Sequence, residues 1–296
     1  MKNNTTISIL CALLAYGLFS SSDTAIKWGS QFVAVTTLQF YIGLFAMLFA
    51  WLVYVLRGKR VQIIPNRPFW VLLRALLSGF AGLFIFLGFA NLRLAQMYTL
   101  IFTLPLFVTV LSYFLLKEEV GPRRALAVFV GFLGVVIANR PWAGGFNIWM
   151  LSGLFGAFLI STSIIITRHN TRYEQSATIT FWAFPGMFVV PFIISFFLEA
   201  PKVVPQDLWL LVVLAAFLLV IAQIATTYAL THAQASLIAP FQYTQIIWAF
   251  IFGALFFDEW FDAPMIVGIV IIISAGIYII HRERVKKSTI VGPLRR

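Results

Sequence analysis

The residues best suited to chemistry in this sequence are two opposite charges inside its first long apolar stretch, Asp23 and Lys27. They stand four residues apart, so on a helix they share one face, with the acid in the favourable N-terminal position. An ionised side chain costs about 2.5–3.5 kcal/mol at the centre of a membrane helix on insertion scales, and such residues are candidate binding groups. One hypothesis is that Asp23 binds a proton or a cationic substrate while Lys27 regulates its charge. The alternative is that Lys27 extends to the outer surface and Asp23 only pairs with it.

Polar and aromatic side chains inside other apolar stretches form the second group of candidates. Lipid offers no hydrogen-bond partner, so a polar group within a span has to face protein or a water-filled cavity. The stretch 234–257 is the richest in such groups, and Tyr98, Trp182 and Trp248 would suit an aromatic cage for a planar, sulfonium or ammonium group. The substrate-binding residues that we expect are Asp23, Gln39, Tyr98, Trp182, Gln223, Gln242, Tyr243, Gln245 and Trp248.

Two prolines lie inside apolar stretches, Pro105 in the first half of the chain and Pro240 in the second. Because proline has no N–H, each frees a backbone carbonyl near the membrane midplane, which permits bending or contributes to a site. We interpret both prolines as hinges, and a kink used only for packing is the alternative. When the two halves are aligned, Tyr243 falls opposite Pro105.

A membrane-embedded enzyme is the main rival class, but the sequence offers it no catalytic constellation. The three histidines lie at the ends of different apolar stretches, and no zinc, nucleophile-elbow or phosphate-loop motif is present. Asp258, Glu259 and Asp262 resemble a carboxylate-rich metal motif without a second cluster, and we interpret them as a solvated cap on an outer loop. We therefore expect no catalytic residue, no metal and no cofactor.

The elements that must hold these residues are membrane helices. Of the 296 residues, 61% are hydrophobic and only 10% are charged, whereas a soluble domain has about 25% charged residues on average. The apolar runs also lack the alternation of a membrane strand. We predict an all-α integral membrane protein with ten transmembrane helices, at residues 6–28, 33–56, 70–91, 94–116, 124–139, 147–167, 176–198, 208–230, 234–257 and 264–281.

The distribution of basic residues predicts the orientation of these helices. Of the 21 Lys and Arg, all but Lys27, Arg93, Arg140 and Lys202 fall on the same side as the N-terminus. Basic residues gather on the cytoplasmic side, so both termini are expected there. The net charge of +11 thus encodes orientation, and we expect membrane lipid but no nucleic acid as a partner. Contact between the basic tail, 282–296, and anionic lipid stays open.

The two halves of the chain are related by an internal repeat, with a first unit at 6–140 and a second at 147–281. Each half holds five spans, and because five is odd the second half lies upside down relative to the first. Inverted repeats that share a midplane cavity are the architecture of alternating-access transporters. The matched positions are Ala95 with Ala233 and Gln96 with Gln234 at an offset of 138, Glu119 with Glu259 at 140, and Pro122 with Pro264 and Gly134 with Gly276 at 142.

These features resemble the drug/metabolite transporter superfamily in its form with two tandem EamA-type repeats. The ten-span plan carries the resemblance together with the segments PLFVTVLSYFLLKEEVGPRR, GFLGVVIANRP and AGIYIIHRERVKK. Within the family, SSSDTAIKW and APFQYTQIIWAFIFGALFFDEW are most similar to S-adenosylmethionine uptake carriers, with riboflavin-type and amphiphile carriers nearby. The chain departs from those relatives early in span two, where QFYIGLF has no basic residue.

The resemblance implies a secondary transporter, without catalysis, of a small organic metabolite across the cell inner membrane. S-adenosylmethionine or a related amphiphilic or aromatic metabolite is the expected substrate. An exporter of amino acids or drugs, or a membrane-embedded enzyme, is the alternative. Direction, coupling to protons or exchange, and oligomeric state are left open by the sequence, with which a homodimer is compatible.

Overall fold

The computed structural model describes residues 2–56, 64–117, 120–142, 147–170, 173–174, 178, 181–198, 204–233 and 235–290. Glu119, part of the predicted span seven and the last residues of the tail, 291–296, lie outside the described residues. The elements run in the order α1 Lys2–Gly29, α2 Val35–Leu56, α3 Pro68–Asn91, α4 Leu94–Ile101, α5 Leu104–Leu116, α6 Pro122–Asn139, α7 Ile148–Asn170, α9 Pro185–Leu198, η1 Gln206–Leu208, α10 Trp209–His232, α11 Ala235–Ile238, η2 Ala239–Thr244, α12 Gln245–Phe257 and α13 Ala263–Ile290.

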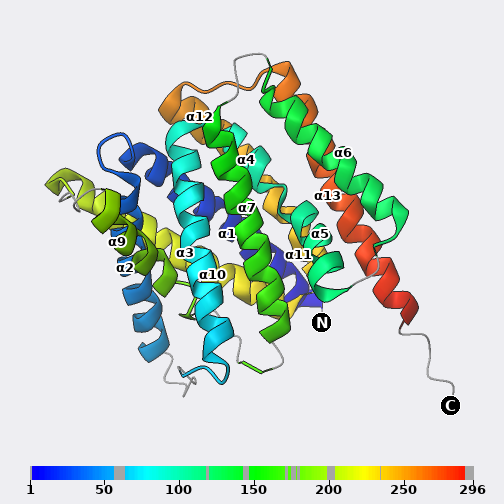
Figure 1. The fold of residues 1–296 in the computed structure, drawn as a ribbon, viewed down its shortest axis with the longest axis horizontal. Helices are drawn as coiled ribbons and strands as arrows, with labels where there is room; N and C mark the ends of the chain where they lie inside the picture. The colour runs from blue at the N-terminus through cyan, green and yellow to red at the C-terminus, as the bar shows by residue number, and fades with distance from the viewer. Residues whose placement is uncertain are drawn as a thin grey trace.

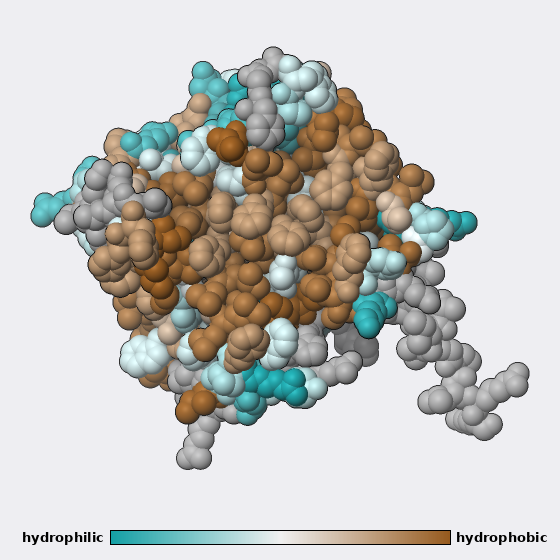
Figure 2. Space-filling view, viewed as in Figure 1, coloured by the Kyte–Doolittle hydropathy of each residue, from teal (hydrophilic) through white to brown (hydrophobic). Residues whose placement is uncertain are grey.

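The described residues form a bundle of helices (Figure 1). Nine segments of the described chain are long and apolar enough to cross a membrane, and Pro185–Phe197 is a tenth, shorter apolar helix. Figure 2 shows hydrophobic side chains across the middle of the visible face, with hydrophilic ones toward its upper and lower edges. Large apolar side chains such as Phe197 and Leu210 lie mostly exposed on this bundle, as lipid-facing residues do. The prediction of an all-α integral membrane protein is confirmed.

Spans four and nine are each broken near the middle, and a turn at 182–184 also interrupts the predicted span 176–198. The predicted span 94–116 is divided into α4 and α5, and the predicted span 234–257 into α11, the 3-10 helix η2 and α12. In inverted-repeat transporters, discontinuous helices of this kind line the substrate site.

The last part of each half is equivalent helix by helix. The helix pairs α4 and α11, α5 and α12, and α6 and α13 all begin 141 residues apart. The alignment by identical residues was therefore wrong by three positions at Ala95 and Ala233, because Ala233 caps α10 whereas Ala95 lies inside α4. It was also wrong for Tyr243 and Pro105, since the starts of α5 and α12 pair Pro105 with Ile246.

Packing between the halves is reciprocal, as a two-fold inverted repeat requires. Helix α1 packs against α10, and its equivalent α7 packs against α3, while α2 pairs with α9 and α6 with α13. Close backbone approaches lie in these interfaces. A side chain at Gly186 of α9 would collide with the backbone of Ala75 on α3, and one at Gly268 of α13 would collide with the backbone of Gly134 on α6. Small residues thus allow the helices of the two repeats to interlock.

Candidate substrate-binding site

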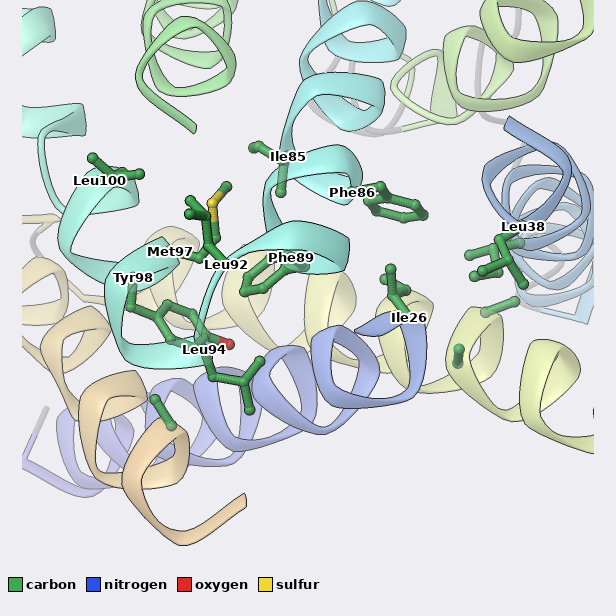
Figure 3. Close-up of a cluster of buried hydrophobic side chains, with 14 of the residues drawn as sticks. Ile26, Leu38, Ile85, Phe86, Phe89, Leu92, Leu94, Met97, Tyr98 and Leu100 are labelled. Carbon is green, nitrogen blue, oxygen red and sulfur yellow. The ribbon is translucent and has the colours of Figure 1, made fainter. Parts of the chain in front are cut away.

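The centre of the candidate site is a hydrogen bond between two helices of the first repeat. The hydroxyl of Tyr98 on α4 donates a hydrogen bond of 2.7 Å to Asp23 Oδ2 on α1, and it lies 3.1 Å from the hydroxyl of Ser20. Phe89 and Phe102 flank the Tyr98 ring at centroid distances of 5.5 and 6.1 Å. Figure 3 shows the Tyr98 hydroxyl turned toward α1 from the buried cluster around Phe89.

Asp23 has no cationic partner within the described part of the chain. Ion pairs in these residues join Lys27 to Glu259 and Arg140 to Asp262, and neither includes Asp23. A carboxylate in an apolar bundle is costly unless it is paired or hydrogen-bonded. The Tyr98 hydroxyl supplies one hydrogen bond, so the site is suited to a positively charged guest.

Lys27 has a different partner from the one that the spacing suggested. Its Nζ lies 2.7 Å from Glu259 Oε1 and also donates to the carbonyl of Leu92, and its side chain is 10% exposed. The ammonium group stands 5.0 Å from the centre of the Phe257 ring, a cation–π contact. The expectation that Lys27 extends to the surface is therefore wrong, because a carboxylate from the second repeat holds it inside the bundle.

The interpretation of the acidic cluster as a solvated cap is wrong for Glu259 and Asp262, whereas Asp258 is exposed. Glu259 pairs with Lys27, and Asp262 pairs with Arg140 while accepting a hydrogen bond from the N–H of Met265. No group of three or more His, Cys, Asp and Glu side chains fit to hold a metal lies in the described ranges. Sequence reasoning missed Glu259 as a partner, although the predicted topology put Lys27 and the acidic cluster on the same side.

The breaks in spans four and nine contain the same local hydrogen bond. Thr103 ends the break after α4 and donates its hydroxyl hydrogen bond to the carbonyl of Leu100, and Thr244 does the same with the carbonyl of Phe241. Pro105 lies in the first turn of α5, and Pro240 in the first turn of η2. Both prolines thus lie at helix breaks, which is where bending is least costly, and their role as hinges stays a prediction.

Tyr243 and Trp248 extend the aromatic side of the site from span nine. The Tyr243 ring meets Phe102 edge-on at a centroid distance of 5.0 Å, and its buried hydroxyl has no hydrogen-bond partner among the described atoms. The Trp248 ring packs against Gly17 of α1, 3.2 Å from the position that a Cβ would take there. Tyr243 thus connects to Tyr98 through Phe102, and Trp248 packs on α1, the helix that carries Asp23.

The remaining candidates make their described contacts elsewhere in the bundle. Gln39 is fully buried between α2 and α3, where its amide donates a hydrogen bond of 2.8 Å to the carbonyl of Gly79. Gln223 lies on α10, partly exposed, and Trp182 lies in the turn before α9, with its ring next to Phe181. Gln245 opens α12 and is buried, whereas Gln242 lies in η2 and is partly exposed.

Comparison with known proteins gives the family. The model of the EamA-like transporter family matches residues 6–140 and again residues 147–282. The chain belongs to the EamA-like transporter family. It is 28% identical to a riboflavin transporter of Rhizobium johnstonii over 95% of this chain and 93% of that protein. It is 26% identical to an S-adenosylmethionine uptake transporter of Rickettsia bellii over 94% of this chain and 96% of that protein.

Two further comparisons extend this result. An uncharacterized transporter of Helicobacter pylori is 27% identical over 94% of this chain and 96% of its own length. A crystal structure of a protein 17% identical in sequence superimposes with a TM-score of 0.66 over 94% of this chain and 98% of the other. This structural similarity supports the fold. Together with the apolar helices, these matches identify a membrane transporter built from two EamA repeats.

Proposed function

We propose that this EamA-family protein is a secondary transporter that moves a small organic cation by alternating access, with the carboxylate of Asp23 as the group that recognises charge. The observation that carries the proposal is the Asp23 carboxylate itself, which faces the Tyr98 hydroxyl and has no cationic partner in the described structure. Such a group favours a guest that brings its own positive charge or a proton.

Aromatic rings supply the second part of the proposed recognition. Tyr98, Phe102 and Tyr243 follow one another in contact, and Trp248 lies on the neighbouring α1 surface. Their faces suit a planar base or a sulfonium group, through stacking and cation–π attraction. S-adenosylmethionine, which combines an adenine ring with a sulfonium, is the substrate that we favour. Gln242 and Gln245, with Gln39, Gln223 and Trp182, stay candidate contacts for its polar groups.

A flavin-like substrate is the second candidate. The same row of aromatic rings would stack on an uncharged tricyclic ring, and a riboflavin transporter is among the relatives. This candidate makes no use of the Asp23 charge, so the two proposals differ in what Asp23 does. Export of amino acids or drugs is a third, less developed, alternative.

The proposed setting of the transporter follows from the distribution of basic residues. We propose that it lies in the cell inner membrane with both termini in the cytoplasm, and that residues 6–140 and 147–281 move as inverted units with 282–296 as a basic tail. On this orientation the Lys27–Glu259 and Arg140–Asp262 pairs lie at the outer end. A homodimer is compatible with this arrangement.

Flux measurements test the proposal. Purified protein in proteoliposomes should accumulate labelled S-adenosylmethionine above empty vesicles, and riboflavin, amino acids and nucleosides complete the panel. Flux of riboflavin but not of S-adenosylmethionine would favour the second candidate. If none of the solutes moved faster than in empty vesicles, the proposed substrate classes would be rejected.

A further inference from the structure

Glu259 touches both helices that carry the candidate site, although it belongs to the second repeat. Its Oε1 lies 2.7 Å from Lys27 Nζ on α1, and its Oε2 accepts a hydrogen bond of 2.7 Å from the N–H of Leu94, the first residue of α4. Lys27 comes four residues after Asp23, and Leu94 comes four residues before Tyr98. The Glu259 bridge therefore lies about one helical turn from the Asp23–Tyr98 hydrogen bond on both helices.

The bridge is enclosed. The Lys27 and Glu259 side chains are only 10% and 14% exposed, and Lys27 is further held by the Leu92 carbonyl and the Phe257 ring. A negative group at the N-terminus of α4 also meets the positive end of that helix. The contacts of Glu259 thus hold α1, α4 and the loop at 258–262 together.

A second ion pair from the same loop provides a comparison. Asp262 pairs with Arg140 at the end of α6, and the two side chains are 34% and 37% exposed. The loop after α12 and the end of α6 both lie at the upper edge of Figure 1. Water screens this pair more than the Lys27–Glu259 pair, so its loss should matter less. The two pairs join the first repeat to the second at one end of the bundle.

We propose that Glu259 is the latch of the outer gate and the positioning residue of the Asp23–Tyr98 site. The path from this end of the bundle is closed while the Glu259 carboxylate bridges Lys27 and Leu94, and it opens when the loop at 258–262 withdraws with the second repeat. Withdrawal removes the partner of Lys27 and the cap of α4 in one step, so α1 and α4 are free to separate. The inference rests on the proposed transport function, because it names one conformational step of that cycle.

A cysteine-accessibility experiment tests the latch without any substrate. The native cysteine is removed by Cys11→Ser, and Ser20→Cys puts a reporter thiol beside the Tyr98 hydroxyl, beneath the bridge. A membrane-impermeant maleimide is applied to right-side-out and inside-out vesicles, and Trp260→Cys, at an exposed neighbour of Glu259, identifies the side on which the loop lies. Glu259→Gln removes the charge but keeps an oxygen that can accept from Leu94.

We expect Glu259→Gln to raise the labelling rate of the reporter from the loop side at least about tenfold, because the partner left behind is a buried ammonium group. The matched variant Asp262→Asn, at the more exposed pair, should change the rate by less than about threefold. A labelling rate unchanged by Glu259→Gln would overturn the proposal, and a brace that only stabilises the fold would lower the melting temperature without changing that rate.

A second variant guards against misfolding. Should Glu259→Gln not yield folded protein, the double variant Lys27→Met with Glu259→Gln removes both charges at similar volume, and it too should label faster from the loop side. An unchanged rate in the double variant overturns the latch as well. Since labelling needs no substrate, failure of the latch is distinguishable from failure of the proposed transport, which appears as an absence of flux.

Discussion

Asp23→Asn isolates the charge that the proposed recognition of a cation requires. The amide oxygen of asparagine still accepts the 2.7 Å hydrogen bond from Tyr98, so the shape of the site is kept while one negative charge is removed. A unit charge about 4 Å from a sulfonium contributes about 4 kcal/mol at an effective dielectric constant near 20. The dissociation constant of S-adenosylmethionine should therefore rise by about 10²–10³-fold.

The assay compares two ligands that differ mainly in charge at sulfur. Equilibrium competition binding to purified protein is measured for S-adenosylmethionine and for S-adenosylhomocysteine, the corresponding uncharged thioether. Asp23→Asn should weaken the first strongly and the second by less than about threefold, since only the first loses a charge pair. The exposed Asp207 provides a matched control, and Asp207→Asn should change neither ligand.

Two results would refute this reasoning. Equally weakened binding of both ligands would mean that the substitution disturbs the shape of the site and that another group recognises the sulfonium. Unchanged binding of S-adenosylmethionine would mean that Asp23 does not face the cation at all. Riboflavin binding that survives Asp23→Asn, together with loss on replacing Tyr98 by alanine, would support the aromatic candidate instead.

Three further predictions concern coupling and stability. If Asp23 also carries the coupling proton, Asp23→Asn should abolish flux driven by a pH gradient while the protein keeps its melting temperature, and unchanged pH dependence in proteoliposomes would reject that role. Gly186→Ala forces a methyl group into the Ala75 backbone and should lower the free energy of unfolding by at least about 1–3 kcal/mol. Gly121→Ala, with open space around it, should lower the free energy of unfolding by less than about 1 kcal/mol. Denaturation in detergent measures both changes. Lys27→Met should lower the free energy of unfolding by roughly 3 kcal/mol in the same assay, because it leaves the Glu259 carboxylate largely buried and without its ion-pair partner. A loss below about 0.5 kcal/mol would contradict the enclosed bridge.

Most helix positions could be predicted from the sequence, because lipid requires long apolar segments whose backbone groups are paired internally. The predicted spans 70–91 and 124–139 agree with α3 and α6 within two residues. The sequence predicted where spans four and nine break but not the geometry of the breaks. Their geometry depends on Thr103 and Thr244, whose hydroxyl groups bond to carbonyls of the preceding turn, and threonine makes the same bond in unbroken helices.

The sequence predicted the charged residues of the candidate site but not the ion pairs that they form. Asp23 and Lys27 were found because charges are rare inside apolar runs. Their spacing favoured a pair with each other, whereas Lys27 pairs with Glu259, which lies in the other repeat. The partner of Lys27 is chosen by how the repeats pack, and no local pattern encodes that choice. The same packing decides that Gln39 meets the backbone of α3.

The structural equivalence of the repeats gives an independent argument for the role of Asp23. Helices α1 and α7 end 141 residues apart, at Gly29 and Asn170, and this offset pairs Ser22 with Ser163 and Asp23 with Ile164. Both serines form a hydrogen bond in the reciprocal interfaces of α1 and α7: Ser22 bonds to the backbone of Ala215 on α10, and Ser163 bonds to the hydroxyl of Ser78 on α3. At the next position the first repeat has a carboxylate where the second has an aliphatic side chain. Ile164 is 37% exposed, whereas Asp23 bonds to the buried Tyr98, so the carboxylate is a feature of the first repeat alone, which supports a role for Asp23 in binding.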